Sequence, residues 1–277
     1  MSNRLTAPVL IRKEAEAGRS TPAAFGSGAV IGALGGLIGL GGAEFRLPLL
    51  IGAFRFAALQ AVILNKAMSI VVVASALPFR AATVSFASVA ASWPIIVNLL
   101  AGSLLGAWCG AEWATRLASK TLYRVIAGLL LGIAVVLVIG HDTAATAGAM
   151  LTGASQILAG VGAGFVIGVV AALLGVAGGE LLIPTLVLLF GADIKLAGSL
   201  SLAVSLPTML VGFARYSRDR SFVVLGENRR FMMVMAAGSI FGSFIGGRLL
   251  GLVPSAVLLP LLAIILVLSA VKVWRHR

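Results

Sequence analysis

Gly39-Leu-Gly-Gly-Ala-Glu-Phe-Arg-Leu-Pro48 and Gly175-Val-Ala-Gly-Gly-Glu-Leu-Leu-Ile-Pro184 are the stretches that decide the fold of this chain. They lie 136 residues apart, and each places a Glu and a Pro behind a cluster of glycines. The same offset aligns many other residues of the two halves without a gap, among them Gly32 with Gly168, Phe54 with Phe190, Ser69 with Ser205, Phe86 with Phe222, and Ser103 with Ser239. One offset that holds from about residue 28 to 120 predicts a duplicated module.

The composition excludes a water-soluble protein. Of the 277 residues, 60% are hydrophobic and only 11% are charged, whereas soluble domains carry about 25% charged residues. Runs such as 125–140 and 252–271 contain no charged residue, and about 20 apolar residues in a helix cross a hydrocarbon core of about 30 Å. The sequence therefore predicts an all-α polytopic membrane protein. Its single cysteine, Cys109, lies in an apolar run and is expected to be a small buried residue.

The positive charges are unevenly spread over the hydrophilic gaps. The net charge is +12, but Lys and Arg gather in segments 1–22, 112–124, 215–230 and 272–277. This pattern is typical of cytoplasmic loops and not of a nucleic-acid-binding surface. Segment 141–155 has no Lys or Arg, and 80–92 and 248–254 have one each, so these gaps should face outward. Both termini are then expected in the cytoplasm of a multi-pass protein of a bacterial-type inner membrane.

Comparison of repeat partners predicts two inverted-topology repeats. The gap at 112–124 is expected inside, whereas its partner at 248–260 is expected outside. Opposite orientations require an odd number of segments in each repeat, and about five result if 26–54 and 162–190 are each interrupted at the glycine cluster. The pieces, of about 11 to 16 residues, are too short for full spans, so we expect broken or re-entrant helices. The predicted organisation is a cytoplasmic tail (1–22), a first membrane repeat (23–140), an outward-facing linker (141–158) and a second membrane repeat (159–277).

Short, interrupted segments at matching positions of inverted repeats point to a central substrate site. Glycine permits a sharp turn and close approach to the backbone, and the helix that restarts after the turn directs a positive dipole end at an anion. We therefore predict that the site is formed by these glycines, with Pro48 and Pro184 supporting the helix breaks, and by polar residues one segment later. The predicted substrate-binding residues are Gly39, Gly41, Gly42, Gly175, Gly178, Gly179, Asn65, Lys66, Ser69, Ser201 and Ser205. For Lys66, snorkelling to the membrane surface is an alternative.

Glu44 and Glu180 occupy equivalent positions at bilayer depth, where a charged residue costs about 2.5–3.5 kcal/mol on insertion scales. One interpretation is proton coupling. The other is that each carboxylate complements the dipole of the helix it begins, with Arg46 or Lys66 as a partner.

The glycines outside the two Gly-Gly-x-Glu motifs have a different interpretation. The ladders at 102, 106, 110 and at 238, 242, 246 are typical of helix packing faces.

At the Gly-Gly-x-Glu-x-x-x-Pro pair the sequence resembles the TauE/SafE family of sulfite and organosulfonate exporters, the TSUP permeases. The resemblance covers 23–275 and implies a bacterial inner-membrane protein for a small sulfur-containing anion such as sulfite or a sulfonate. Two features depart from the family pattern. Its usual triple glycine is Gly41-Gly42-Ala43 in the first half and Ala177-Gly178-Gly179 in the second, and Arg46 adds a charge where apolar residues are common.

We expect a secondary permease or exporter in which one half rocks against the other. Its expected partners are a small anionic solute and the lipid bilayer, with a homodimer as an open alternative and no nucleic acid. A non-transporting scaffold or assembly protein and a passive anion channel are the alternative functions. An enzyme is not expected, because the sequence has neither a His-Glu-x-x-His motif nor a phosphate-binding Gly-x-x-x-x-Gly-Lys-Ser/Thr loop. No metal and no cofactor are expected.

Overall fold

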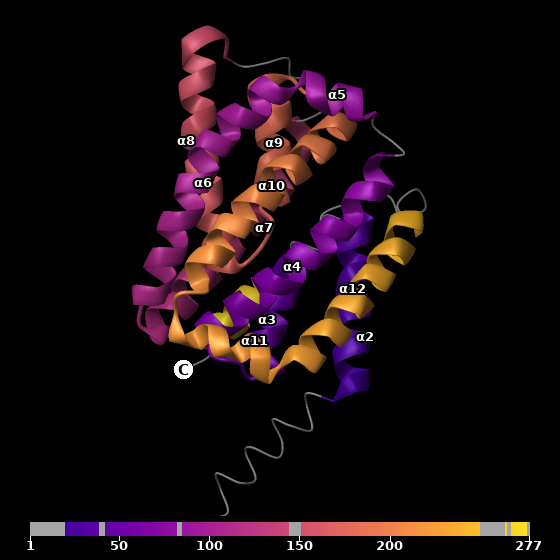
Figure 1. The fold of residues 1–277 in the computed structure, drawn as a ribbon, viewed down its shortest axis with the longest axis vertical. Coiled ribbons are helices and arrows are strands. Elements are labelled where there is room, and N and C mark those ends of the chain that lie inside the picture. The colour runs from indigo at the N-terminus through magenta and orange to yellow at the C-terminus, as the bar shows by residue number, and fades with distance from the viewer. Residues whose placement is uncertain are drawn as a thin grey trace, which may run out of the picture.

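A computed structural model describes residues 20–38, 42–81, 85–143, 151–249, 264 and 267–275, and within these ranges the elements are helices (Figure 1). The first half of the chain contains α2 (Thr21–Ile38), α3 (Ala43–Gly52), α4 (Ala58–Ala81), α5 (Phe86–Ala91), α6 (Trp93–Arg116) and α7 (Ser119–Thr143). The second contains α8 (Gly153–Leu174), α9 (Gly179–Phe190), α10 (Ile194–Tyr216), the 3-10 helix η1 (Arg220–Val223), α11 (Val224–Glu227) and α12 (Arg229–Leu249). A further helical segment covers 267–275.

The described helices differ in whether they are long enough to cross a membrane. Four of them, α4, α6, α8 and α10, are long and apolar enough to cross a membrane. In contrast, α3 and α9 have 10 and 12 residues, or about 15 and 18 Å at helical rise, which is about half of a hydrocarbon core. The predicted all-α polytopic membrane protein is confirmed.

Equivalent helices begin at the spacing of the sequence repeat. The first residues of α3 and α9, of α4 and α10, and of α6 and α12 are each 136 residues apart. The short helix α5 precedes α6 as α11 precedes α12. In Figure 1, α5 lies at the upper end of the molecule and α11 at the lower end.

Two close parallel helix pairs are made possible by the glycine ladders. On α6, Gly102, Gly106 and Gly110 face Val161, Phe165 and Val169 of α8, and a Cβ added at Gly106 would lie 2.0 Å from the Phe165 carbonyl oxygen. On α12, Gly238, Gly242 and Gly246 face Phe25, Ala29 and Ala33 of α2, and a Cβ at Gly242 would lie 1.9 Å from the Ala29 oxygen. The prediction that these six glycines are packing faces is confirmed.

These pairs join helices from different halves of the sequence. Each pair takes one helix from each half, so that α2, α3, α4 and α12 form one group and α6, α8, α9 and α10 form the other (Figure 1). The two groups meet where α4 contacts α10. The sequence halves therefore interlock and do not form separate bodies.

Cys109 differs from its expectation, because it is exposed. The residue precedes Gly110, whose ladder faces α8, and successive helix positions point about 100° apart. Cys109 therefore lies off the packing face of α6.

Candidate functional site

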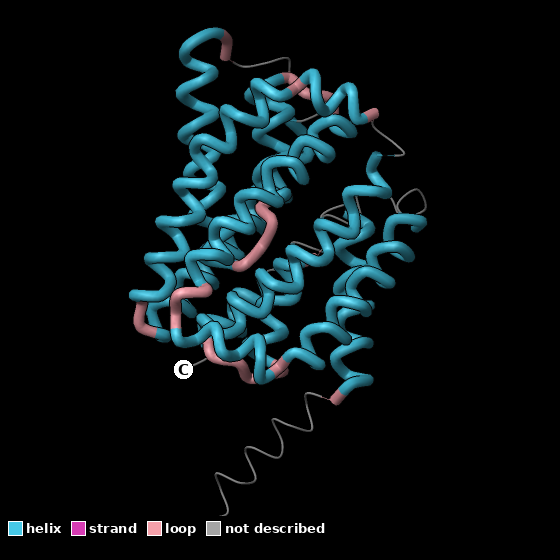
Figure 2. The backbone as a smooth tube through the Cα atoms, in the orientation of Figure 1, coloured by secondary structure: helices cyan, strands magenta, loops and turns pink. Residues whose placement is uncertain are grey.

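The break between α8 and α9 is buried in the middle of the molecule. Helix α8 ends at Leu174 and α9 begins at Gly179, and the loop between them runs through the interior (Figure 2). Gly175 and Gly178 have φ of +68° and +80°, a left-handed conformation that glycine adopts without steric cost. Residues 171–180 are all buried.

After the break, α9 runs back along α8. At its start, a Cβ added at Gly178 would lie 3.1 Å from Ile167 Cγ2. At its end, Gln156 Nε2 near the beginning of α8 donates a 2.8 Å hydrogen bond to the Leu189 carbonyl. The α8–α9 segment is thus a helical hairpin.

The first half repeats this geometry where it is described. Gly42, the counterpart of Gly178, has φ of +71°, and a Cβ there would lie 3.0 Å from Ile31 Cγ2. Gly39 and Gly41 lie outside the described residues. Gly179 is the buried first residue of α9, and its φ is not in the left-handed region. Pro48 and Pro184 lie inside α3 and α9.

Glu44 and Glu180 meet between the two breaks. They lie in the first turns of α3 and α9, are 2% and 5% exposed, and are near enough for their charges to act on each other. Each carboxyl thus lies where a carboxylate complements a helix start. One oxygen of each, Glu44 Oε1 and Glu180 Oε2, has no hydrogen-bond partner.

Arg46 is the most unusual residue near the breaks. It is 0% exposed, and within the described residues the hydrogen-bond partners of its guanidinium are neutral oxygens. Nη1 donates to Ser69 Oγ at 3.3 Å and to Asn65 Oδ1 at 3.5 Å, and Nη2 donates to Ser239 Oγ at 3.4 Å. Its Nε has no partner. No ion pair involves Arg46 within the described ranges, so a buried positive charge is held by long bonds to neutral groups.

Arg46 was not among the residues predicted for the site, although the sequence contains a signal for it. Its repeat partner is Leu182, whereas Ser69 and Ser239 have serine partners, Ser205 and Ser103. A charge that appears in one copy only, beside polar residues that appear in both, marks a position where the two halves differ in chemistry.

Asn65 and Lys66 bind the end of α8. Asn65 Nδ2 donates to the carbonyls of Ala43 and Leu174, both at 3.0 Å, and Lys66 Nζ donates to the Ala171 carbonyl at 2.9 Å. The last carbonyls of a helix lack intrahelical partners and form its negative end, so a cation is stabilised there. Snorkelling of Lys66 is therefore wrong, because its side chain is 0% exposed.

The serines of α10 have different surroundings. Ser205 Oγ donates to the Ala177 carbonyl inside the break at 2.7 Å. Ser201 Oγ donates to Gly198 within its own helix at 2.9 Å. The structure thus brings Asn65, Ser69 and Ser205 to the breaks, and it does not bring the Ser201 hydroxyl into contact with them.

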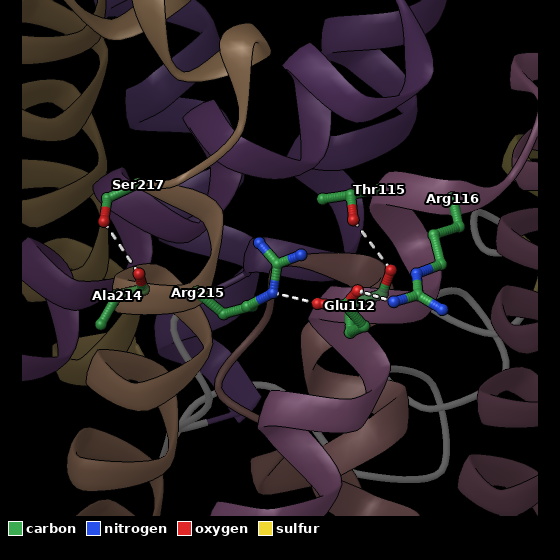
Figure 3. Close-up of polar contacts among 6 residues, drawn as sticks. All are labelled: Glu112, Thr115, Arg116, Ala214, Arg215 and Ser217. Carbon is green, nitrogen blue, oxygen red and sulfur yellow. Dashed lines mark hydrogen bonds and ion pairs between the residues drawn. The ribbon is translucent and has the colours of Figure 1, made fainter.

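A separate ionic cluster lies at the last turns of α6 and α10 (Figure 3). Glu112 pairs with Arg116 at 2.5 Å and accepts a hydrogen bond from Arg215 Nε. Thr115 and Ser217 donate to carbonyls of their own helices at 2.8 Å. Glu112 therefore ties the end of α6 to the end of α10. Among the described residues, no group of three His, Cys, Asp or Glu side chains could hold a metal ion.

The first half of the chain, which contains α3 and Arg46, matches a known protein-family model. Residues 5–137 match the sulfite exporter TauE/SafE model. This stretch is similar to the TauE/SafE family. The match confirms the resemblance seen at the glycine motifs, and it covers α2 to α6 and most of α7. No curated protein and no solved structure matched the chain significantly. Several helices long enough to span a bilayer make this a multi-pass membrane protein, and residues 5–137 are similar to an exporter family.

Proposed function

We propose that this protein is a secondary transporter for a small anion, of the sulfite or sulfonate type, in a bacterial inner membrane. The buried guanidinium of Arg46 carries the proposal. A charge taken out of water is expensive unless it is paired, and arginine binds oxyanions through several charge-assisted hydrogen bonds. The hydrogen-bond partners of Arg46 are neutral, and Glu44 acts on its charge without an ion pair in the described ranges, so the guanidinium can still pair with a substrate anion.

Inverted topology of the repeats is supported by the directions of equivalent helices. In Figure 1, α2 begins at the lower end of the molecule and its counterpart α8 begins at the upper end. Because α12 packs parallel to α2 and α6 packs parallel to α8, the equivalent helices α6 and α12 also run in opposite directions. The α8–α9 hairpin supports a re-entrant segment that ends near the bilayer midplane.

The orientation with a basic cytoplasmic face is supported by contacts among the charged segments. Arg215 binds Glu112, which brings the gaps at 112–124 and 215–230 together, and Arg124 lies over the Trp274 ring at 6.0 Å, which adds the carboxyl-terminal segment. Cytoplasmic loops are enriched in Lys and Arg. We therefore place this end in the cytoplasm.

The interlocked helices change the proposed motion. A movement of one sequence half against the other would pull α2 from α12 and α6 from α8, the closest contacts in the molecule. We propose instead that the α2/α3/α4/α12 group moves against the α6/α8/α9/α10 group, with the break between them. An open channel is less favoured, because Arg46, Asn65 and Lys66 are all 0% exposed and water has no access to them in this arrangement.

Replacement of Arg46 tests the proposal. In detergent, an anion that binds the folded protein raises its apparent stability, so a screen of sulfite, sulfate, thiosulfate, methanesulfonate and acetate should contain at least one stabilising anion. In Arg46→Leu, which installs the residue found at 182, loss of a charged hydrogen bond of about 1.5–3 kcal/mol should weaken Kd about 10- to 150-fold.

Arg220→Leu is the matched control, because it removes the same charge from an exposed position and should leave Kd and reconstituted flux unchanged. Unaltered anion binding by a folded Arg46→Leu protein would contradict the assignment of Arg46. A purified wild type that binds and moves no anion in liposomes would instead favour a scaffold function.

A further inference from the structure

Two buried serines beside Arg46 have hydroxyl hydrogens that no oxygen of the described residues accepts. Ser69 and Ser239 are 2% and 0% exposed, and each Oγ accepts a hydrogen bond from the Arg46 guanidinium. A hydroxyl that accepts a bond still has one hydrogen to donate. Helical hydroxyls commonly give this hydrogen to a carbonyl of their own helix, as Thr185 and Ser201 do at 2.7 and 2.9 Å.

Ser103 is the repeat partner of Ser239, and the backbones of these two serines are placed alike. A Cβ added at Gly32 would lie 2.1 Å from the Ser239 carbonyl oxygen, and one at Gly168 would lie 2.3 Å from that of Ser103. The hydroxyls, however, are used differently. Ser103 Oγ lies 2.7 Å from Thr208 Oγ1. Because Thr208 gives its own hydrogen to a carbonyl of its helix, Ser103 is the donor of this bond.

The second repeat also closes the position that corresponds to Ser69. Its partner, Ser205, donates to the Ala177 carbonyl in the helix break at 2.7 Å. Leu182 stands where the first repeat has Arg46. At these equivalent positions the second repeat therefore satisfies its own hydroxyls, whereas the first repeat leaves donors without acceptors.

The unused donors lie together on one of the two helix groups. Arg46, Ser69 and Ser239 come from α3, α4 and α12, and Arg46 Nε also lacks a partner among the described residues. A buried donor without an acceptor is costly, and an oxyanion accepts several hydrogen bonds at once. A guanidinium flanked by two hydroxyl donors is therefore suited to bind one.

We propose that the hydroxyls of Ser69 and Ser239 are ligands of the transported anion, and that each chain binds one anion through donors of α3, α4 and α12. This inference rests on the proposed anion site at Arg46 and names the groups that complete it. Each hydroxyl keeps its bond from Arg46 as an acceptor and donates its hydrogen to an oxygen of the anion. The hydroxyls of α6 and α10 already have acceptors and take no part, so the anion is held by the α2/α3/α4/α12 group.

Alanine variants of four serines test the assignment. With methanesulfonate as the probe, calorimetry in detergent should give one anion per wild-type chain. Ser69→Ala and Ser239→Ala should each weaken Kd about tenfold, because each removes one hydrogen bond to a charged group. Ser205→Ala and Ser103→Ala are the matched controls from the equivalent positions, and they should leave Kd unchanged.

A double-mutant cycle separates direct binding from a role in holding Arg46 in place. In an Arg46→Leu background, a serine that only positions the guanidinium has nothing left to act on, so its alanine variant should show no further loss. A serine that donates to the anion should still contribute. We expect Ser69→Ala and Ser239→Ala each to weaken Kd by a further factor of about three to ten there. Thermal shift over a wide range of anion concentrations reaches the weaker Kd values of this background.

The outcomes separate this inference from the proposed function. Unchanged Kd in Ser69→Ala and Ser239→Ala, an equal loss in Ser205→Ala and Ser103→Ala, two anions per wild-type chain, or no further loss in the Arg46→Leu background would each overturn the hydroxyl ligands. The anion transporter would still stand if Arg46→Leu itself weakens binding. Failure of every anion in the screen to bind contradicts the proposed function, and the hydroxyl ligands with it.

Discussion

The last carbonyls of α8 collect side chains that reach across the centre of the molecule. Lys66 binds the Ala171 carbonyl, Asn65 binds that of Leu174, and Tyr216 Oη donates to that of Ala172 at 2.9 Å. In water these carbonyls would be solvated, but in the buried break they depend on protein donors. Several polar residues around the break therefore stabilise the helix end, whereas Arg46 is the residue that we propose to bind a ligand.

Tyr216→Phe tests this division at the level of one hydroxyl. Tyr216 is 0% exposed, so loss of its bond should destabilise the protein by about 1–2 kcal/mol and lower the melting temperature in detergent, while the anion Kd stays unchanged. Ser217→Ala removes an exposed hydroxyl from the neighbouring residue (Figure 3) and should change stability by less than about 0.5 kcal/mol. An equal effect of the two variants would show that the Tyr216 bond does not support the break.

At the scale of the elements, the helices are fixed by backbone contacts that only glycine allows. The α6–α8 and α2–α12 pairs bring carbonyl oxygens to about the position of an absent Cβ. Association of membrane helices depends on such close packing, because lipid supplies no hydrophobic drive between them. The breaks use glycine for another reason, namely its left-handed φ.

Alanine substitutions at equivalent ladder positions should expose this constraint. Gly106→Ala and Gly242→Ala each place a methyl group on a backbone oxygen, and overpacking of this kind costs about 1–3 kcal/mol. Both variants should melt earlier than the wild type. Gly128→Ala is the control within α7, because nothing lies within 4 Å of its added Cβ, and helix propensity there favours alanine by up to about 1 kcal/mol. Equal melting temperatures for all three variants would disprove the packing role.

The elements show what the sequence could and could not predict. Apolar runs predict the lengths of the helices, and glycines spaced four residues apart predict the packing ladders. Glycines before a Glu predict the helix breaks. All three are local signals in the sequence. The partners of Arg46 and Lys66 could not be predicted, because Ser239 and Ala171 are 193 and 105 residues away from them. Only the packing of the two halves brings them together. For the same reason the sequence left snorkelling as an alternative for Lys66 and did not place Arg46 among the substrate-binding residues.

At the scale of the whole molecule, the pairing of α2 with α12 and of α8 with α6 defines the two bodies for which we propose relative motion. The α6–α10 contact lies within one body, where Ser103 Oγ and Thr208 Oγ1 are 2.7 Å apart. The α4–α10 contact lies between bodies, where Val73 and Met209 belong to one buried cluster. If transport requires relative motion of the two groups, a covalent cross-link between α6 and α10 should be tolerated. A cross-link between α4 and α10 should block transport.

Paired cysteines in a Cys109→Ser background test this assignment of bodies. Oxidation of Ser103→Cys with Thr208→Cys should leave anion flux near its reduced level. Oxidation of Val73→Cys with Met209→Cys should abolish flux, and reduction should restore it. Flux that survives the α4–α10 bond, or that is lost with the α6–α10 bond alone, would contradict the proposed motion.

The central claim is that equivalent segments of the two repeats face opposite sides of the membrane, which places both helix breaks at its middle. Ala90 in α5 and Gly226 in α11 are repeat partners and both are exposed. The decisive measurement is labelling of single cysteines at these positions, in a Cys109→Ser background, with a membrane-impermeant maleimide on intact and on permeabilised cells. We predict that Ala90→Cys reacts in intact cells and that Gly226→Cys reacts only after permeabilisation. Reaction of both cysteines from the same side would contradict the inverted repeats and the anion site built on them.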